Sequence, residues 1–136
     1  MDMTVKSPVL ELRVALTVDE YAAALRFYRD ALGLPVVEEW DEPAGSGAIL
    51  DAGQATLELL STSQTELVDR IEVGGAGRSG PVRLALEVED SERLAETLAA
   101  EGAELLGGPV VTPWSHRNVR LRAPDGMQLT LFTVLD

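Results

Sequence analysis

Hydrophobic and polar residues alternate in the segment 9–18, VLELRVALTV. From position 10 onward, leucine and valine fill the even positions, and charged or small residues fill the odd ones. This alternation predicts a half-buried strand. Residues 19–33 then carry apolar side chains at helical spacing and end at a glycine, which predicts a helix. Three short strand-like runs follow, separated by proline and glycine: PVVEEW, GAILDAG and ATLELL.

The same order of patterns recurs in the second half of the chain. Residues 82–90 alternate like a strand, residues 91–105 have helical spacing, and the strand-like runs LLGGPVVT, HRNVRLRAPDG and MQLTLFTV follow. The two halves also match in sequence, because RVALTV aligns with RLALEV at an offset of 70 residues and LEL with LTL at an offset of 72. Two copies of one βαβββ unit explain this order. The predicted fold is therefore α+β, with two paired βαβββ modules and curved mixed sheets.

A different composition separates the two halves. STSQTELVDRI can form a short helix, and VGGAGRSGP has the glycine content of a linker. We therefore expect a first module at 1–62, a linker with this short helix and Gly-rich segment at 63–81, and a second module at 82–136. One module has too little core to stand alone. Two modules side by side make a concave cup suited to a small molecule, built within one chain or shared between two by module swapping.

The charge and composition of the chain argue against several classes of binding partner and several kinds of site. The net charge is −12, and no basic patch of the kind that binds nucleic acid or anionic membranes is visible. The chain has no cysteine and a single histidine, His116, which excludes disulfides, thiolate metal sites and sites that need two histidines from one chain. No apolar run approaches the ~18 residues of a membrane span, and the N-terminal segment lacks the apolar region of a signal peptide. We expect a cytoplasmic protein without nucleic-acid or membrane partners.

Three segments together resemble the vicinal oxygen chelate superfamily: RVALTVDEYAAALRFYRDALGL, RLALEVED and PWSHRNVRLRAPDGMQLTLF. That superfamily includes glyoxalase I, the extradiol dioxygenases, fosfomycin-resistance enzymes and the bleomycin-resistance binding proteins. The resemblance implies paired βαβββ modules with ligands in the concave sheets, often in a homodimer. A sheet with exposed edges also gains burial by joining a second copy. We expect a homodimer.

The resemblance also indicates where metal-using members hold their ion. Their ligands come from the first and last strands of each module, and those positions here are Arg13, Glu58, Arg83 and Thr130. All four have the parity opposite to the helix-facing leucines, so the strand pattern places them on the concave face. Arginine has no free lone pair and threonine is a weak ligand, which leaves Glu58 as the only good donor. We therefore expect no metal and no cofactor.

Two roles for these charged residues stay open. Glu58 can pair with Arg13 or Arg83, so that an ion pair takes the place of the metal. Alternatively, one arginine is left free to clamp a ligand carboxylate or phosphate through two hydrogen bonds.

Aromatic residues cluster near the same strands. Trp40 and Trp114 lie near the ends of matching strand regions, where they can stack on a planar aromatic or cationic compound, or fill a sheet edge or a dimer contact. Phe132 has the parity of Thr130 and is expected to line the same cup. The position of His116, two residues after Trp114, favours ligand contact over proton transfer.

These expectations favour a metal-independent small-molecule binding protein, similar to the antibiotic-sequestering members of the superfamily and without catalytic residues. Its ligand would be an aromatic or cationic compound. The alternatives are a glyoxalase-like lyase or isomerase or a dioxygenase, using a metal or a metal-free mechanism through Glu58 or His116, and a carrier or regulatory partner in a biosynthetic pathway. The expected ligand-binding residues are Arg13, Trp40, Glu58, Arg83, Trp114, His116, Thr130 and Phe132.

Overall fold

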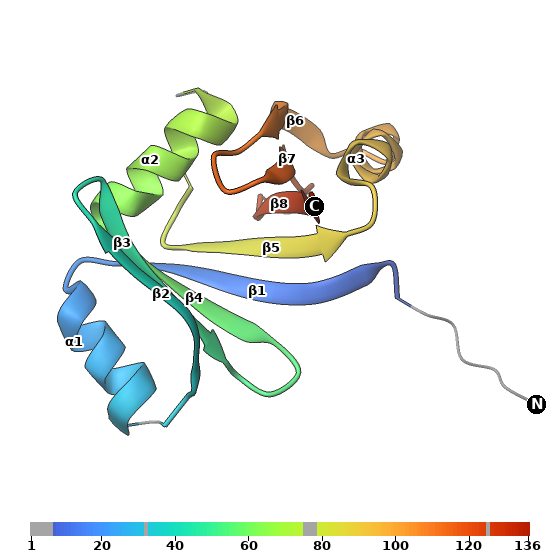
Figure 1. Cartoon of the computed structure of the whole chain (residues 1–136). Helices are drawn as coiled ribbons and strands as arrows, with labels where there is room; N and C mark the ends of the chain where they lie inside the picture. Colours follow the sequence, from blue (N-terminus) through green and yellow to red (C-terminus); the bar gives the residue numbers. More distant parts are fainter. Residues whose placement is uncertain (1–6, 32, 75–78, 125) are drawn as a thin grey trace, which may run out of the picture.

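The computed structural model of the chain describes residues 7–31, 33–74, 79–124 and 126–136. Eight strands form one curved sheet in the order β2-β3-β4-β1-β5-β8-β7-β6 (Figure 1). The elements in chain order are β1 (Val9–Val18), α1 (Tyr21–Leu25), η1 (Arg26–Ala31), β2 (Val36–Glu42), β3 (Gly45–Asp51), β4 (Thr56–Ser61), α2 (Thr62–Val73), β5 (Val82–Val88), α3 (Ser91–Ala100), β6 (Glu104–Val111), β7 (His116–Arg122) and β8 (Gln128–Val134).

The sheet consists of two βαβββ modules joined edge to edge. In each module the first strand runs parallel to the last, β1 beside β4 and β5 beside β8. The modules meet where β1 pairs antiparallel with β5, with Arg13 opposite Ala85 and Ala15 opposite Arg83. The predicted α+β fold is confirmed. In this single chain, both halves of the concave face come from the two modules of the same molecule.

Apolar residues of one strand parity pack under the outer helices. The core beneath α1 contains Leu25, Ala48, Leu50 and Leu59. The core beneath α3 contains Val88, Ala95, Val119, Leu121 and Leu131. Since successive side chains of a strand point to opposite faces, the residues between these positions face the concave side. Sequence alternation thus decides which side chains lie on the concave face.

The predicted first helix differs from the structure in its geometry. After α1 the chain continues as the π-helical segment η1, and Leu32 lies outside the described residues. Leu25 is buried, and Tyr21, Ala24 and Tyr28 pack around the same cluster. The wider turn therefore keeps the apolar stripe of this segment on the core.

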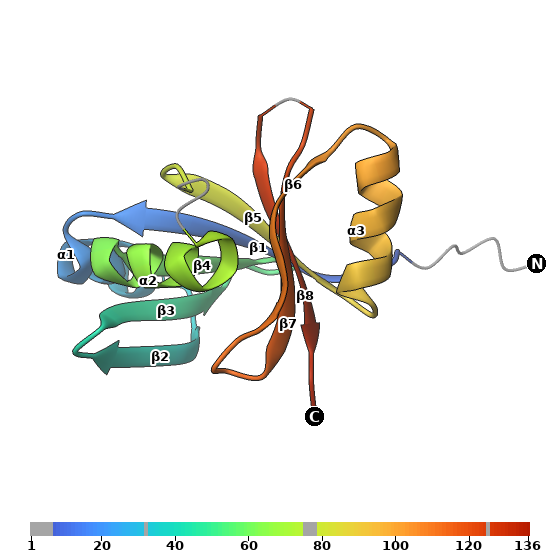
Figure 2. The ribbon, with the colours of Figure 1, turned by 90° about the horizontal axis from the view of Figure 1, so that it is seen from above.

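Helix α2 occupies the concave side of the sheet, whereas α1 and α3 lie outside (Figures 1 and 2). The Ser61 hydroxyl caps it by accepting a hydrogen bond from the Gln64 N–H at 3.2 Å. The helix ends at Gly74, whose left-handed φ of 57° suits glycine. The segment expected to allow a short helix thus forms a 12-residue helix that fills part of the cup. Residues 75–78 of the Gly-rich segment lie outside the described residues, and the division into 1–62, 63–81 and 82–136 stays a prediction.

None of the helices in the described ranges is both long and apolar enough to cross a membrane.

Candidate functional site

A pocket of about 510 Å³ opens in the concave face, between the sheet and α2. Strands from both modules contribute to it, as do Leu67, Val68 and Ile71 of the helix. All eight residues expected to bind a ligand line this one pocket: Arg13, Trp40, Glu58, Arg83, Trp114, His116, Thr130 and Phe132. The structure therefore brings them together. Their part in ligand binding stays a prediction.

The pocket floor places two opposite charges on either side of a small residue. Ala15 of β1 pairs with Glu58 of β4 on one side and with Arg83 of β5 on the other. Arg83 is only 5% exposed, and its Nη1 donates to the Thr130 hydroxyl at 2.7 Å. The described residues contain no carboxylate in an ion pair with Arg83.

Arg13, the second arginine of the floor, is already engaged. Its Nε donates to Glu11 Oε2 at 2.8 Å, and its guanidinium carbon lies 4.9 Å from the centre of the Phe132 ring. Its Nη1 is 4.0 Å from Glu58 Oε2, which is too long for a hydrogen bond. Of the two expected partners of Glu58, Arg13 is the nearer, and the contact is weak.

Burial governs the titration of Glu58. Loss of solvation raises the pKa of this carboxyl above its ordinary value of 4.5, and the charges of Arg83 and Arg13 offset only part of that rise. The carboxylates of Glu72 and Glu38 raise it further. Within the described residues, no hydrogen-bond donor reaches this half-buried carboxylate, and such an arrangement is costly when the group is charged.

Aromatic side chains form the walls. The His116 ring stacks on Phe132 with centroids 5.0 Å apart and planes 16° from parallel. Burial, and then the charge of Arg13, lower the pKa of His116 below 6.5. The Trp40 indole lies so close over Gly47 that a Cβ at that position would overlap it. Trp114 stands at the rim, 40% exposed. The rings of all four residues therefore line the pocket.

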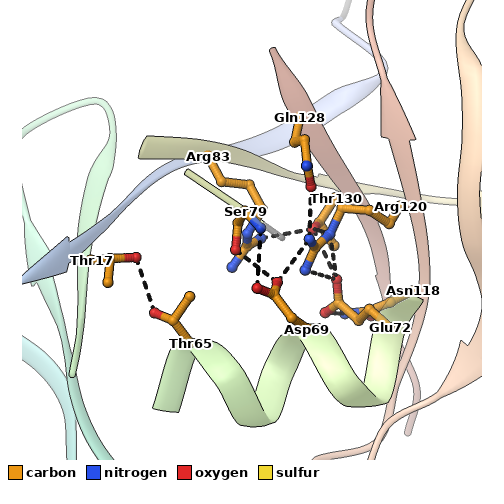
Figure 3. Close-up of polar contacts among 10 residues, drawn as sticks. All are labelled: Thr17, Thr65, Asp69, Glu72, Ser79, Arg83, Asn118, Arg120, Gln128 and Thr130. Atoms are coloured by element: carbon orange, nitrogen blue, oxygen red, sulfur yellow. Dashed lines mark hydrogen bonds and ion pairs between the residues drawn. The ribbon is translucent and has the colours of Figure 1, made fainter. Parts of the chain in front are cut away.

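A buried network that the sequence did not predict closes the second-module side of the cup (Figure 3). Arg120 of β7 is 0% exposed, and its Nε donates to Glu72 of α2 at 3.0 Å while its Nη1 donates to Asp69 at 3.0 Å. Its Nη2 lies 2.9 Å from Glu72 Oε1, as an ion pair without the geometry of a hydrogen bond. The Asn118 amide also donates to Glu72, at 2.8 Å.

The signal for this network was present but incomplete. Alternation in HRNVRLR puts His116, Asn118 and Arg120 on one strand face, opposite to Val119 and Leu121. The acidic partners lie on the linker helix, whose position over the sheet depends on contacts far apart in sequence.

The four family positions for a metal do not fit one in this chain. Thr130 Oγ1 accepts from Arg83 at 2.7 Å and from Arg120 at 3.1 Å, and it donates to Glu72 at 3.1 Å. Its lone pairs are therefore used by guanidinium groups. Arg13 and Arg83 bring positive charge and no lone pair. Within the described ranges, no three His, Asp or Glu residues are grouped to hold a metal ion.

Comparison with known proteins agrees with this architecture. A Bacillus subtilis (strain 168) protein described as uncharacterized protein YraH is 29% identical over 128 residues, covering 91% of this chain and 98% of that protein. Methylmalonyl-CoA epimerase from Mycobacterium tuberculosis superimposes with a TM-score of 0.68 at 21% identity, covering 98% of this chain and 94% of the epimerase. At that identity the likeness shows a shared fold.

A Vibrio splendidus 12B01 protein of the glyoxalase/bleomycin resistance protein/dioxygenase superfamily has a TM-score of 0.62 at 16% identity, covering 90% of this chain and 97% of its own. The sequence model of the Glyoxalase/Bleomycin resistance protein/Dioxygenase superfamily matches residues 12–131. That match spans most of both modules. The chain therefore belongs to the glyoxalase/bleomycin resistance protein/dioxygenase superfamily.

Proposed function

We propose that this protein binds a small molecule in the concave pocket without a metal ion. The observation that carries the proposal is the presence of Arg13 and Arg83 at two of the four metal-ligand positions of the family, inside a pocket of about 510 Å³. Guanidinium groups cannot coordinate a cation, but they can bind the anionic or acceptor groups of an organic ligand. A pocket of this size suits a drug-sized molecule.

The walls support a planar aromatic or cationic ligand. Trp40 and Trp114 supply stacking surfaces, and an aromatic pair contributes roughly 0.5–1.5 kcal/mol beyond the buried area. Phe132 also lines the pocket, but it is 3% exposed and its ring is already in contact with His116 and Arg13. Glu38, Glu42 and Glu58 line the same pocket and would attract a cation. The overall charge of −12 acts in the same direction.

Tryptophan fluorescence and thermal melting across a panel of planar aromatic compounds, cationic and neutral, test this proposal. We expect at least one compound to quench the emission and raise Tm. We expect Trp114→Ala to weaken the binding of that compound about tenfold. Phe27→Ala is the matched control, because Phe27 is exposed and does not line the pocket. A panel that changes neither the emission nor Tm would count against the proposal.

The second candidate function is that of an enzyme, a glyoxalase-like lyase or isomerase or a dioxygenase. The observation favouring it is Glu58, a half-buried carboxyl that lines the pocket and has a raised pKa, since such groups concentrate at catalytic sites. Metal analysis of the purified protein, followed by assays with added Mn²⁺, Ni²⁺ or Fe²⁺, separates the two functions. Stoichiometric metal dependent on Glu58 would favour the enzyme.

We also propose that the protein is a homodimer in the cytoplasm, with a role in antibiotic sequestration that rests on family analogy. Exposed apolar side chains on both outer strands support the dimer, Val36 and Val37 on β2 and Leu105 and Val111 on β6. Light scattering coupled to gel filtration measures the mass of the assembly, and a monomer at micromolar concentration would contradict the dimer.

A further inference from the structure

We infer that the ligand of this pocket is a zwitterion, whose cationic group faces Glu58 and whose anionic group faces Arg83. This inference rests on the proposed function and specifies the class of ligand. It follows from two oppositely charged side chains, one buried and one half-buried, whose contacts with the described residues leave most of their charge unpaired.

Arg83 is the unsatisfied cation of the floor. Its guanidinium has five N–H donors, and the one hydrogen bond it makes with the described residues is the 2.7 Å contact of Nη1 with the Thr130 hydroxyl. That hydroxyl is neutral and is shared with Arg120. At 5% exposure, Arg83 has little access to bulk water that could solvate its charge. An anionic group entering the pocket would meet several free donors.

Glu58 is the unsatisfied anion. The described residues donate no hydrogen bond to its carboxylate, and the nearest cation is Arg13 Nη1 at 4.0 Å. Arg13 directs its Nε to Glu11 instead. An ammonium or protonated amine would supply both the charge and the donors that Glu58 lacks.

The geometry puts the two groups beside each other without joining them. Glu58 on β4 and Arg83 on β5 lie on either side of Ala15 on β1, so their backbones are two strand spacings apart, about 10 Å. Ala15 itself is only 3% exposed and does not line the pocket, so Glu58 and Arg83 reach the pocket from either side of a covered residue. Glu58 and Arg83 nonetheless form no ion pair within the described chain. Two opposite charges on one small ligand can bridge this gap.

The neighbouring Arg120 shows how the same cup satisfies a buried guanidinium that serves the fold. Arg120 has two carboxylates, from Asp69 and Glu72, and the side-chain oxygen of Gln128 at 2.9 Å. Arg83 lies on the same face and has none of these. The contrast separates a structural arginine from one that is available to a ligand.

Singly charged ligands satisfy only half of the site. A cationic ligand would pair with Glu58 but would be repelled by Arg83. An anionic ligand would pair with Arg83 but would be repelled by Glu58. In a pocket of low dielectric, both the gain and the repulsion exceed their values in water. A zwitterion with a planar ring meets both charges and leaves its ring to Trp40 and Trp114.

Isothermal titration calorimetry at neutral pH with three compounds that share an indole ring tests the inference. L-tryptophan carries a positive and a negative charge, tryptamine carries only the positive charge, and 3-indolepropionate carries only the negative charge. We expect L-tryptophan to bind at least about tenfold more tightly than either of the others, because a charge-assisted hydrogen bond contributes enough for such a ratio. Equal or weaker binding of L-tryptophan would overturn the inference.

Two variants, each lacking one of the two charges, should affect the singly charged compounds in opposite ways. Glu58→Gln should weaken the binding of L-tryptophan and tryptamine about tenfold and should tighten the binding of 3-indolepropionate, whose repulsion it removes. Arg83→Gln should weaken the binding of L-tryptophan and 3-indolepropionate about tenfold and should tighten the binding of tryptamine for the same reason. The control is Glu104→Gln, an exposed partner of Arg122 outside the pocket, which should change none of the three. Equal weakening of all three compounds by either pocket variant would contradict the inference.

A folding check on each variant and the panel of planar aromatic compounds separate failure of this inference from failure of the proposed function. Circular dichroism checks each variant, and if Arg83→Gln does not fold, the three-compound comparison on the unaltered protein decides. Binding of panel compounds without a preference for L-tryptophan overturns this inference and leaves the proposed function standing. Failure of every indole and every panel compound to bind would overturn both.

Discussion

Arg120 of β7 and Glu72 of α2, 48 positions apart in the chain, form a fully buried contact in which Arg120 Nε donates to Glu72 Oε1 at 3.0 Å. This contact holds the helix between the modules against the second half of the sheet (Figure 3). The Thr65 hydroxyl contacts the Thr17 hydroxyl of β1 at 3.1 Å, nearer the start of the helix. The helix that forms one wall of the pocket is therefore fixed at both modules.

Arg120→Ala should lower the free energy of unfolding by about 3–5 kcal/mol, since it leaves the buried carboxylates of Asp69 and Glu72 without their shared cation. Urea denaturation measures the change. Arg122→Ala is the matched control from the same strand, because its ion pair with Glu104 is exposed and should contribute less than about 1 kcal/mol. Equal losses in the two variants would refute a structural role for Arg120.

Gly107→Ala tests the position of α2 independently of charge. A Cβ on Gly107 of β6 would overlap the Glu72 carbonyl oxygen and approach Val73, both at the end of the helix. We expect a loss of about 1–3 kcal/mol from this overpacking, seen as a lower Tm. Gly80→Ala is the control, because nothing lies within 4 Å of its Cβ position. An unchanged Tm for Gly107→Ala would mean that α2 does not sit against β6.

Glu58→Gln should make the stability of the protein less sensitive to rising pH. Because the folded state raises the pKa of Glu58 above 4.5, the folded protein holds this proton more tightly than the unfolded chain. The contribution of the Glu58 proton to the stability of the folded state is therefore complete below pH 4.5, and it is lost as the pH rises through the raised pKa. We expect the variant to match the unaltered protein at about pH 4 and to be more stable at about pH 8, by urea denaturation at each pH. A difference that does not grow with pH would contradict the burial of this carboxyl.

His116 should titrate below its ordinary value, because burial and then the charge of Arg13 lower its pKa from 6.5. As the only histidine, it gives a single set of imidazole signals in an NMR titration. We expect a midpoint below 6.5 and an upward shift in Arg13→Gln, which removes one of the two causes. Arg29→Gln, on the far side of the first module, should leave the midpoint unchanged. A midpoint above 6.5 would place the ring in contact with an acidic partner instead.

Periodicity predicted the fold and the faces well, because it reports a local property. Alternation in β1 and β5 was sufficient to place Arg13 and Arg83 away from the leucines, and the structure puts both in the pocket. The repeat supplied the second module at the correct offset. The face of the sheet on which a side chain lies is encoded by the residues within a few positions of it in the sequence.

The closing of the cup could not be predicted in the same way. Asp69 and Glu72 look like the polar face of a solvated helix, and only their contact with Arg120, 51 and 48 positions away, shows that they are buried. The engagement of Arg13 by Glu11 instead of Glu58 depends on side-chain geometry. Pairing across the sheet and the choice of ion-pair partner are tertiary properties, which a local pattern does not record.

Helix α2 also bears on the number of ligands that the proposed pocket would hold. A duplicated βαβββ unit has internal twofold pseudosymmetry, and a bare cup would offer two related half-sites on either side of the β1–β5 seam. The helix occurs once per chain, and its carboxylates occupy the second half-site in the described structure. The repeated unit supplies two similar halves, and the connecting helix makes them unequal, so we predict that the proposed pocket binds one ligand per chain.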